Sequence, residues 1–190
     1  RTTSTGESMI NIMTSAPENE TGVANETGVS NEIIVSKIRS ALQNLADNAQ
    51  PTTLIWSVNH TITDVSFGDE LHTVTGPGYI EETIDGHRYR ISPNAFFQTN
   101  SHASPSLLQT VQEFAGDLHN KILLDLYCGT GFFAVAMAKE AKRTIGIELS
   151  ADAIHDARIN AELNNVSDDF HDAKTETFDW MSLGADIVIL

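Results

Sequence analysis

A glycine-rich turn and a carboxylate that follows it form the sharpest chemical signal in the chain. Gly129 and Gly131 come directly after the apolar run 122–126, and Glu148 ends the next apolar run. Glycines allow a tight turn and close approach of a ligand to the backbone, and the following helix offers its free N-terminal amides. A carboxylate at the tip of the neighbouring strand can accept both hydroxyls of a ribose. The pattern therefore predicts a nucleoside-cofactor site on a Rossmann-like sheet.

The spacing alone leaves the identity of the cofactor open. The G-x-G-x-x-A pattern from Gly129 to Ala134 also fits dinucleotide binding. One alternative is therefore another S-adenosylmethionine-dependent methyltransferase or an NAD-linked oxidoreductase on the same kind of sheet. A non-catalytic binding module, in which the turn is only structural, is another. Two features favour S-adenosylmethionine. Asp125, just before the turn, suits a cationic methionine amino group better than a pyrophosphate, and more than half of the chain precedes the turn, whereas a dinucleotide module usually begins its domain.

A second signal lies in residues 91–100, with the sequence I-S-P-N-A-F-F-Q-T-N. The adjacent aromatics Phe96 and Phe97, followed by Gln98, could stack on a base or line a cofactor pocket. Taken alone, the segment is better explained by aromatics that pack a seam between domains. Combined with the glycine turn, it favours a functional interpretation.

Ordered motifs along the chain resemble one enzyme family. The motifs are I-S-P-x-x-F-F-Q-x-N from residue 91, L-D-L-Y-C-G-x-G-x-F from residue 124, I-G-I-E from residue 145 and A-R-I-N-A-E-L-N-N from residue 157. Together they resemble the S-adenosylmethionine-dependent RNA (uracil-5-)-methyltransferase family over nearly the whole chain. The resemblance implies methyl transfer from S-adenosylmethionine to carbon 5 of a uridine in rRNA or tRNA, with the RNA bound through the full-length protein.

The resemblance also implies which residues bind the cofactor. Gln98 would lie near the methyl end, Tyr127 near the adenosine and Glu148 on the ribose. Phe132 stands where the family often has Asn, which puts a polar contact there in doubt. The full set of expected cofactor-binding residues is Gln98, Asp125, Tyr127, Gly129, Gly131, Phe132 and Glu148.

No catalytic residue is expected within the chain. In this family a cysteine thiolate adds to carbon 6 of uracil, the resulting enolate attacks the methyl group, and a general base removes the proton from carbon 5. By the resemblance, the cysteine and the basic glutamate follow Leu190. We therefore expect a fragment that also lacks the family's N-terminal RNA-binding barrel and that shows no turnover alone. Cys128, within the cofactor loop, is interpreted as a small packing residue.

The elements that must position these residues follow from the hydrophobic pattern. In residues 93–190, helices alternate with buried apolar strands, which predicts a parallel sheet with helical crossovers. This part is interpreted as the N-terminal part of an α/β, Rossmann-like class I methyltransferase domain, truncated at its end. Its helices are expected at 104–118, 132–141 and 151–164, and its strands at 122–126, 144–147, 167–171 and 186–190.

Residues 1–92 are interpreted as a smaller, strand-rich α+β central domain. Asp85 and Gly86 form a two-residue hairpin signal, and a near-repeat at 20–31 is interpreted as a loop. A helix is expected from Asn31. The expected strands are 7–15, 53–58, 70–75, 79–84 and 87–91.

The composition limits the partners. The chain has 190 residues, with 11 Lys and Arg against 26 Asp and Glu, and its formal net charge of −15 repels polyanions. An RNA substrate therefore needs a basic surface elsewhere in the full-length protein.

The seven histidines show no metal-ligand spacing, so no metal is expected in this chain. No apolar run could span a bilayer, and the single cysteine suits a reducing compartment, so we expect a cytoplasmic location without membrane contact.

Overall fold

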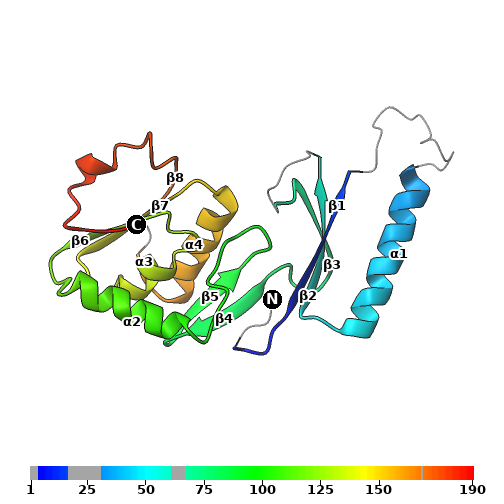
Figure 1. Cartoon of the computed structure of the whole chain (residues 1–190), viewed down its shortest axis with the longest axis horizontal. Helices are drawn as coiled ribbons and strands as arrows, with labels where there is room; N and C mark the ends of the chain where they lie inside the picture. Colours follow the sequence, from blue (N-terminus) through cyan, green and yellow to red (C-terminus); the bar gives the residue numbers. More distant parts are fainter. Residues whose placement is uncertain (1–3, 17–30, 61–66, 168) are drawn as a thin grey trace. The chain divides into compact units, whose positions relative to one another are not determined.

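The computed structural model describes residues 4–16, 31–60, 67–167 and 169–190 (Figure 1). The near-repeat interpreted as a loop lies outside this part, apart from its last residue. The chain forms two compact units. The first spans Glu7–Ile80, and the second contains Glu81–Leu190 together with a short N-terminal segment that includes residues 4–6.

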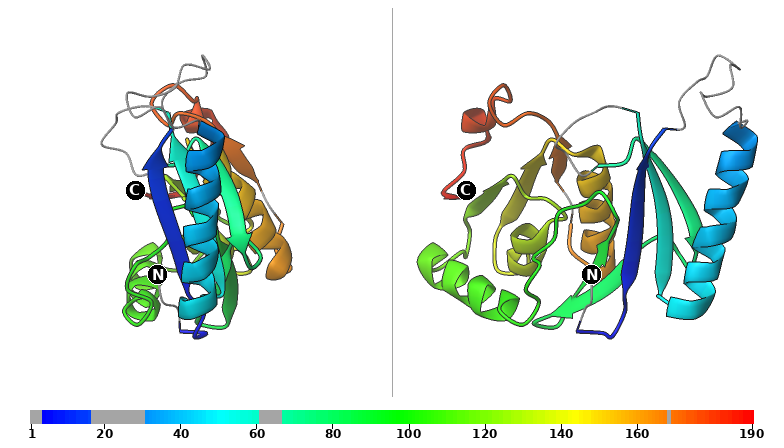
Figure 2. Two further views of the ribbon diagram at one scale, coloured as in Figure 1. Left: turned by 90° about the vertical axis from the view of Figure 1, so that its right-hand side faces the viewer. Right: turned by 45° about the vertical axis from the view of Figure 1, so that its right-hand side comes forward.

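The first unit is a three-stranded sheet covered by one helix. Its strand order is β1-β2-β3, with β1 parallel to β2 and β2 antiparallel to β3. Leu42 and Ala46, one helical turn apart, pack on Leu54, Trp56 and Val58, which alternate along the central strand and so share one face. The helix lies along one face of the sheet in Figure 2. The elements are β1 (Met9–Ser15), α1 (Asn31–Ala49), β2 (Thr53–Asn59) and β3 (Glu70–Thr75).

The second unit contains a four-stranded sheet in the order β8-β7-β6-β9. All three neighbouring pairs are parallel, so the prediction of a Rossmann-like α/β sheet is confirmed. Its strands are β6 (Ile122–Leu126), β7 (Arg143–Glu148), β8 (Phe170–Asp172) and β9 (Ile187–Ile189). Its helices are α2 (Ser104–Ala115), α3 (Phe132–Met137) and α4 (Ala151–Leu163), with a 3-10 turn at Trp180–Leu183 that the sequence analysis missed.

The strand order places a topological switch point beside β6. The chain moves outward from β6 to β7 and β8, and then returns to add β9 on the other side of β6. Connections on the two sides of such a point diverge, which leaves a crevice at the carboxyl ends of the strands. The glycine turn follows β6 and therefore opens into this crevice.

Two predicted helices end earlier than expected. The helix predicted to reach residue 118 stops at Ala115, because Gly116 has a φ of 66° and its N–H donates to the Gln112 carbonyl at 3.0 Å. The helix predicted to reach residue 141 stops at Met137, where the backbone continues in a tighter turn with a bond from Glu140 N–H to the Met137 carbonyl.

The hairpin of β4 (Ile80–Ile84) and β5 (His87–Ile91) turns where the sequence indicated. Asp85 and Gly86 have φ values of 48° and 77°, the two positive angles that a type I′ turn requires. The compact units divide at Ile80, whereas the sequence analysis set the domain boundary after Ser92. The physical reason for this difference is that β5 bonds to α4.

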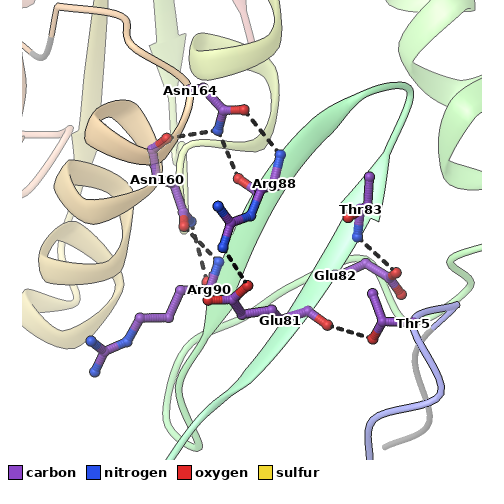
Figure 3. Close-up of polar contacts among 8 residues, drawn as sticks. All are labelled: Thr5, Glu81, Glu82, Thr83, Arg88, Arg90, Asn160 and Asn164. Atoms are coloured by element: carbon purple, nitrogen blue, oxygen red, sulfur yellow. Dashed lines mark hydrogen bonds and ion pairs between the residues drawn. The ribbon is translucent and has the colours of Figure 1, made fainter.

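Three polar side chains on one face of α4 and that of its C-cap residue, Asn164, bond to alternate residues from β5 onward, and we call this set the polar ladder. Each step pairs four residues of helix, about 6 Å of rise, with two residues of strand, about 6.6 Å. The two periods match closely enough for the pairing to continue over four rungs, two of which are drawn in Figure 3. The pairs are Asn164 with Arg88, Asn160 with Arg90, Asp156 with Ser92 and Asp152 with Asn94, at 2.6 to 3.2 Å.

The polar ladder has a consequence for the segment that contains Gln98. The last rung ties Asn94 Nδ2 to Asp152 Oδ2 at 3.0 Å, only four residues before Gln98. The helix that carries the ladder begins directly after Glu148. The ladder therefore connects two parts of the chain that the sequence analysis assigned to one cofactor site.

Candidate cofactor site

A cavity of about 120 Å³ lies at the carboxyl ends of β6 and β9. Five predicted site residues line it, namely Gln98, Asp125, Tyr127, Gly129 and Phe132. Gly131 and Glu148 are not part of its lining; Gly131 belongs to the loop that forms one wall, and Glu148 accepts a hydrogen bond from that loop. The cavity is smaller than typical ligand pockets of 300 to 1,000 Å³, so it can enclose only part of a nucleoside cofactor.

The loop between β6 and α3 has a left-handed backbone at alternate residues. Tyr127, Gly129 and Gly131 have φ values of 63°, 54° and 79°. Glycine adopts such angles without strain, whereas a tyrosine does so at a cost of about 1 to 2 kcal/mol. Strained residues of this kind concentrate at binding sites, where the surrounding structure holds them in place.

Glu148 is oriented by two backbone amides. Its Oε2 accepts a hydrogen bond from Gly129 N–H at 3.1 Å, and its Oε1 accepts one from Ser150 N–H at 2.9 Å. Each carboxylate oxygen has a second lone pair, so both can still accept a hydroxyl. The arrangement holds the carboxylate beside the glycine loop, where a ribose can bind to it.

Asp125 is a buried carboxyl with few partners. It is 2% exposed, and its Oδ2 accepts a hydrogen bond from Ala134 N–H at 3.2 Å. Among the described residues its Oδ1 has no hydrogen-bond partner. Burial raises the pKa of Asp125 to about 7, the Ala134 N–H opposes this rise, and the charge of Glu148 adds to it. A cationic ligand in the cavity would favour the ionised form of this carboxyl.

Thr130 supplies an observation that tests the fit of a ligand. It lines the cavity and is 1% exposed, yet its Oγ1 bonds to no group in the part of the chain that the structure describes. A buried hydroxyl without a partner is costly, and ligand-binding sites are where such groups are tolerated. With Asp125 nearby, the cavity therefore offers an acceptor for a cation and a hydroxyl for a polar group, which fits the methionine end of S-adenosylmethionine.

The two adjacent aromatics that follow Pro93 have different environments. Phe97 is 2% exposed and lies among the rings of Tyr89 and Phe132, with centroids 5.4 and 5.7 Å away. Phe96 is 63% exposed and lines the cavity. Phe132 also lines the cavity and contributes an apolar wall.

Tyr127 is 57% exposed, with its hydroxyl 3.3 Å from Glu176 Oε1. Its ring is thus available to a flat ligand beside the loop.

The only cysteine, Cys128, is buried, and burial raises the pKa of its thiol. It packs close to Gly146, where an added Cβ would lie 2.8 Å from Cys128 Sγ.

Sequence reasoning missed three contributors to this region. Ile189 and Leu190 line the cavity from β9, and Thr130 carries the unpartnered hydroxyl. The polar ladder was also missed, although its signal was present as polar residues four apart at positions 152, 156, 160 and 164. Such a stripe on a helix otherwise indicates an exposed face.

A larger cavity of about 490 Å³ lies away from these residues, at the amino end of β7 and beside the residues that precede β8. Its lining includes Lys139, Lys142 and Arg143, and Arg143 forms an ion pair with Asp169. None of the predicted site residues lies there.

Among the described residues, no group of His, Cys, Asp and Glu side chains could hold a metal ion, and no helix is long and apolar enough to cross a membrane.

A parallel sheet with a glycine loop at its switch point and a carboxylate at the end of the next strand is the arrangement expected of a class I methyltransferase fold. The chain matches the family described as tRNA (Uracil-5-)-methyltransferase over residues 72–172, more than half of its length. The chain therefore belongs to this family. An NAD-linked oxidoreductase is not favoured by this match.

Individual relatives agree with this assignment. An uncharacterized RNA methyltransferase of Nanoarchaeum equitans is 37% identical over 129 residues, which are 68% of this chain and 28% of the relative. The tRNA (uracil(54)-C(5))-methyltransferase of Pyrococcus furiosus is 39% identical over 127 residues, 67% of this chain and 30% of the relative. The chain thus spans less than a third of these curated relatives.

A solved structure extends the similarity to the whole chain. The Pyrococcus abyssi tRNA (uracil-54, C5)-methyltransferase, in complex with S-adenosyl-L-homocysteine, has a TM-score of 0.69 and 30% identity. The match covers 100% of this chain and 41% of that structure. Both units of this chain therefore have counterparts in a solved relative.

Proposed function

We propose that this chain forms the S-adenosylmethionine-binding part of an enzyme that methylates carbon 5 of a uridine in tRNA or rRNA. The observation that carries the proposal is the pair of carboxylates at the switch point. Asp125 is buried, with one oxygen that no described residue bonds, and Glu148 is held against the glycine loop. Membership of the family supplies the reaction class.

Each residue of the site is assigned to one part of the cofactor. Asp125 attracts the methionine ammonium, Thr130 binds a polar group next to it, and Glu148 accepts the ribose hydroxyls. Tyr127 and Phe96 offer exposed rings to flat groups. Gln98 lines the same cavity, and we assign it to the methyl end of the cofactor. When bound, S-adenosylmethionine supplies an electrophilic methyl group on its sulfonium.

The uridine-activating step needs a group that this chain does not offer. Cys128 is its single cysteine, and the thiol is 6% exposed with a raised pKa, so it cannot serve as a thiolate nucleophile. We therefore propose that the nucleophile and the base belong to the full-length protein. We also propose that the basic surface for RNA lies outside this chain, whose net charge is −15, and that the protein works in the cytoplasm.

Calorimetric titration of this chain with S-adenosylhomocysteine, and separately with NAD, tests the cofactor assignment. Saturable binding of S-adenosylhomocysteine with no heat from NAD is the expected result. Glu148→Ala should weaken binding by on the order of tenfold or more, because a charge-assisted bond is worth roughly 1.5–3 kcal/mol. Glu140→Ala removes an exposed carboxylate outside the cavity and should bind like the unchanged chain. A folded chain that binds NAD, or neither ligand, contradicts the proposal.

A further inference from the structure

Asn160 connects β5 to the glycine loop of the cofactor cavity through a single side chain. It is wholly buried on α4. Its Oδ1 accepts from Arg90 N–H at 2.6 Å, and its Nδ2 donates to the carbonyls of Arg90 and Thr130 at 3.2 and 3.0 Å. Arg90 belongs to β5, which leads into the segment with Phe96 and Gln98, whereas Thr130 lies in the glycine loop (Figure 3 shows the pairing with Arg90).

The chemistry of these bonds requires a carboxamide. A carboxylate can accept from Arg90 N–H but has no proton for either carbonyl, and an aliphatic side chain can do neither. The bonds from Asn160 satisfy the Oδ1 acceptor and use both donor directions of Nδ2. A buried network that is fully satisfied fixes one arrangement, whereas a partly satisfied one does not.

The bond to Thr130 acts on one peptide unit of the glycine loop. The carbonyl of that unit is held by Asn160, and its N–H, from Gly131, donates to the Cys128 carbonyl at 2.9 Å. Both ends of the peptide unit are therefore fixed. Because Gly131 tolerates positive and negative φ alike, its own preferences would not prevent the unit from rotating. Rotation would exchange a carbonyl for an N–H within the loop.

We propose that Asn160 is a positioning residue for the cofactor site, acting through the Thr130–Gly131 peptide unit rather than by touching the cofactor. The proposal rests on the function proposed above. It assigns to α4 a role in setting the loop's hydrogen-bonding groups, in addition to packing. The neighbouring rung provides a matched comparison, since Asn164 makes the same pairing with Arg88. The Nδ2 of Asn164 also bonds to the Asn160 carbonyl within its own helix, not to the glycine loop.

The test compares Asn160→Asp with Asn164→Asp in the whole chain. Each variant loses a carboxamide from the polar ladder, so both should lower the melting temperature. Only Asn160→Asp should also weaken S-adenosylhomocysteine binding, by about tenfold, the worth of one hydrogen bond. Only Asn160→Asp should speed hydrogen exchange at the Gly131 amide in the ligand-free protein. Equal affinity and equal Gly131 exchange in the two variants would overturn the proposal.

Two additions keep the result unambiguous. Asn160→Ser leaves a smaller side chain and replaces Asn160→Asp if the latter does not fold, with the same expectations for Gly131 exchange and affinity. Exchange at Gly131 is measured without ligand, so it reports on the loop even if the unchanged chain fails to bind S-adenosylhomocysteine. In that case the proposed function fails. Faster exchange in Asn160→Asp would still support the hold of Asn160 on the glycine loop, and unchanged exchange would overturn that role as well.

Discussion

The Asp125 carboxylate accepts a hydrogen bond from the backbone N–H of Ala134 at 3.2 Å, and this is its one hydrogen bond to the described residues. A buried carboxylate usually receives two or three such bonds or an ion pair. Asp125 therefore has a raised pKa, about 7 against an ordinary 3.8. Ionisation of Asp125 therefore lowers the stability of the folded chain, and a bound cation would offset this cost.

The first prediction concerns stability. Between pH 4 and 7 the unfolded chain loses the Asp125 proton and the folded chain retains it, so this group lowers the free energy of unfolding as pH rises. Asp125→Asn removes this effect and keeps an acceptor for Ala134 N–H. The variant should match the unchanged chain in melting temperature near pH 4 and exceed it above pH 7. A variant that melts lower at pH 8 would contradict the prediction.

The second prediction concerns the pH dependence of binding. Ionised Asp125 attracts the ligand's ammonium group, so S-adenosylhomocysteine should bind more tightly at pH 8 than at pH 6. Asp125→Asn should bind more weakly than the unchanged chain at pH 8 and lose most of this dependence between the two pH values. Calorimetry at both pH values measures it. The same pH dependence in the variant would assign the effect to another group.

The third prediction separates strain from function at Tyr127. Tyr127→Gly relieves a left-handed backbone and should raise stability toward urea by about 1 kcal/mol. The same change removes an exposed ring beside the loop and should weaken S-adenosylhomocysteine binding several-fold. Asn165→Gly is the control, because Asn165 also has a positive φ of 54° but lines the distant, larger cavity. Its affinity should remain unchanged. Loss of binding in both variants would show a general effect of glycine.

The fourth prediction tests close packing under the glycine loop. A Cβ at Gly146 would lie 2.4 Å from Phe170 Cδ1 and 2.8 Å from Cys128 Sγ. Gly146→Ala should therefore cost about 1 to 3 kcal/mol of stability in urea unfolding. The double variant Gly146→Ala with Phe170→Leu should recover part of this loss relative to the sum of the single effects. Full additivity would show that Phe170 does not carry the clash.

Local patterns were sufficient to predict the parts of the site that lie within one strand–turn–helix unit. The turn after β6 was predicted because its glycines interrupt a buried apolar run, and strands β3, β5 and β6 have the predicted bounds. The roles of the individual residues in binding a cofactor remain predictions. Glu148 was found because it ends an apolar run at the expected distance from the turn.

What could not be predicted depends on contacts between distant segments. Asn160 and Arg90 are 70 residues apart, and nothing local distinguishes a polar stripe that pairs with a strand from one that faces water. The same limitation applies to the two compact units. The β4–β5 hairpin looks like a continuation of the preceding strands, but it belongs to the second unit, where β5 bonds to α4 and Tyr89 packs against Phe97 and Phe132.

The polar ladder also protects a strand edge. A two-stranded hairpin leaves main-chain groups open on its outer side, and such edges invite pairing with strands from other molecules. On β5 the amides and carbonyls of Arg88 and Arg90 are already occupied by Asn164 and Asn160. The side chains of the helix thus occupy the main-chain groups that a strand from another molecule would need. Such a strand could pair with β5 only by breaking these hydrogen bonds.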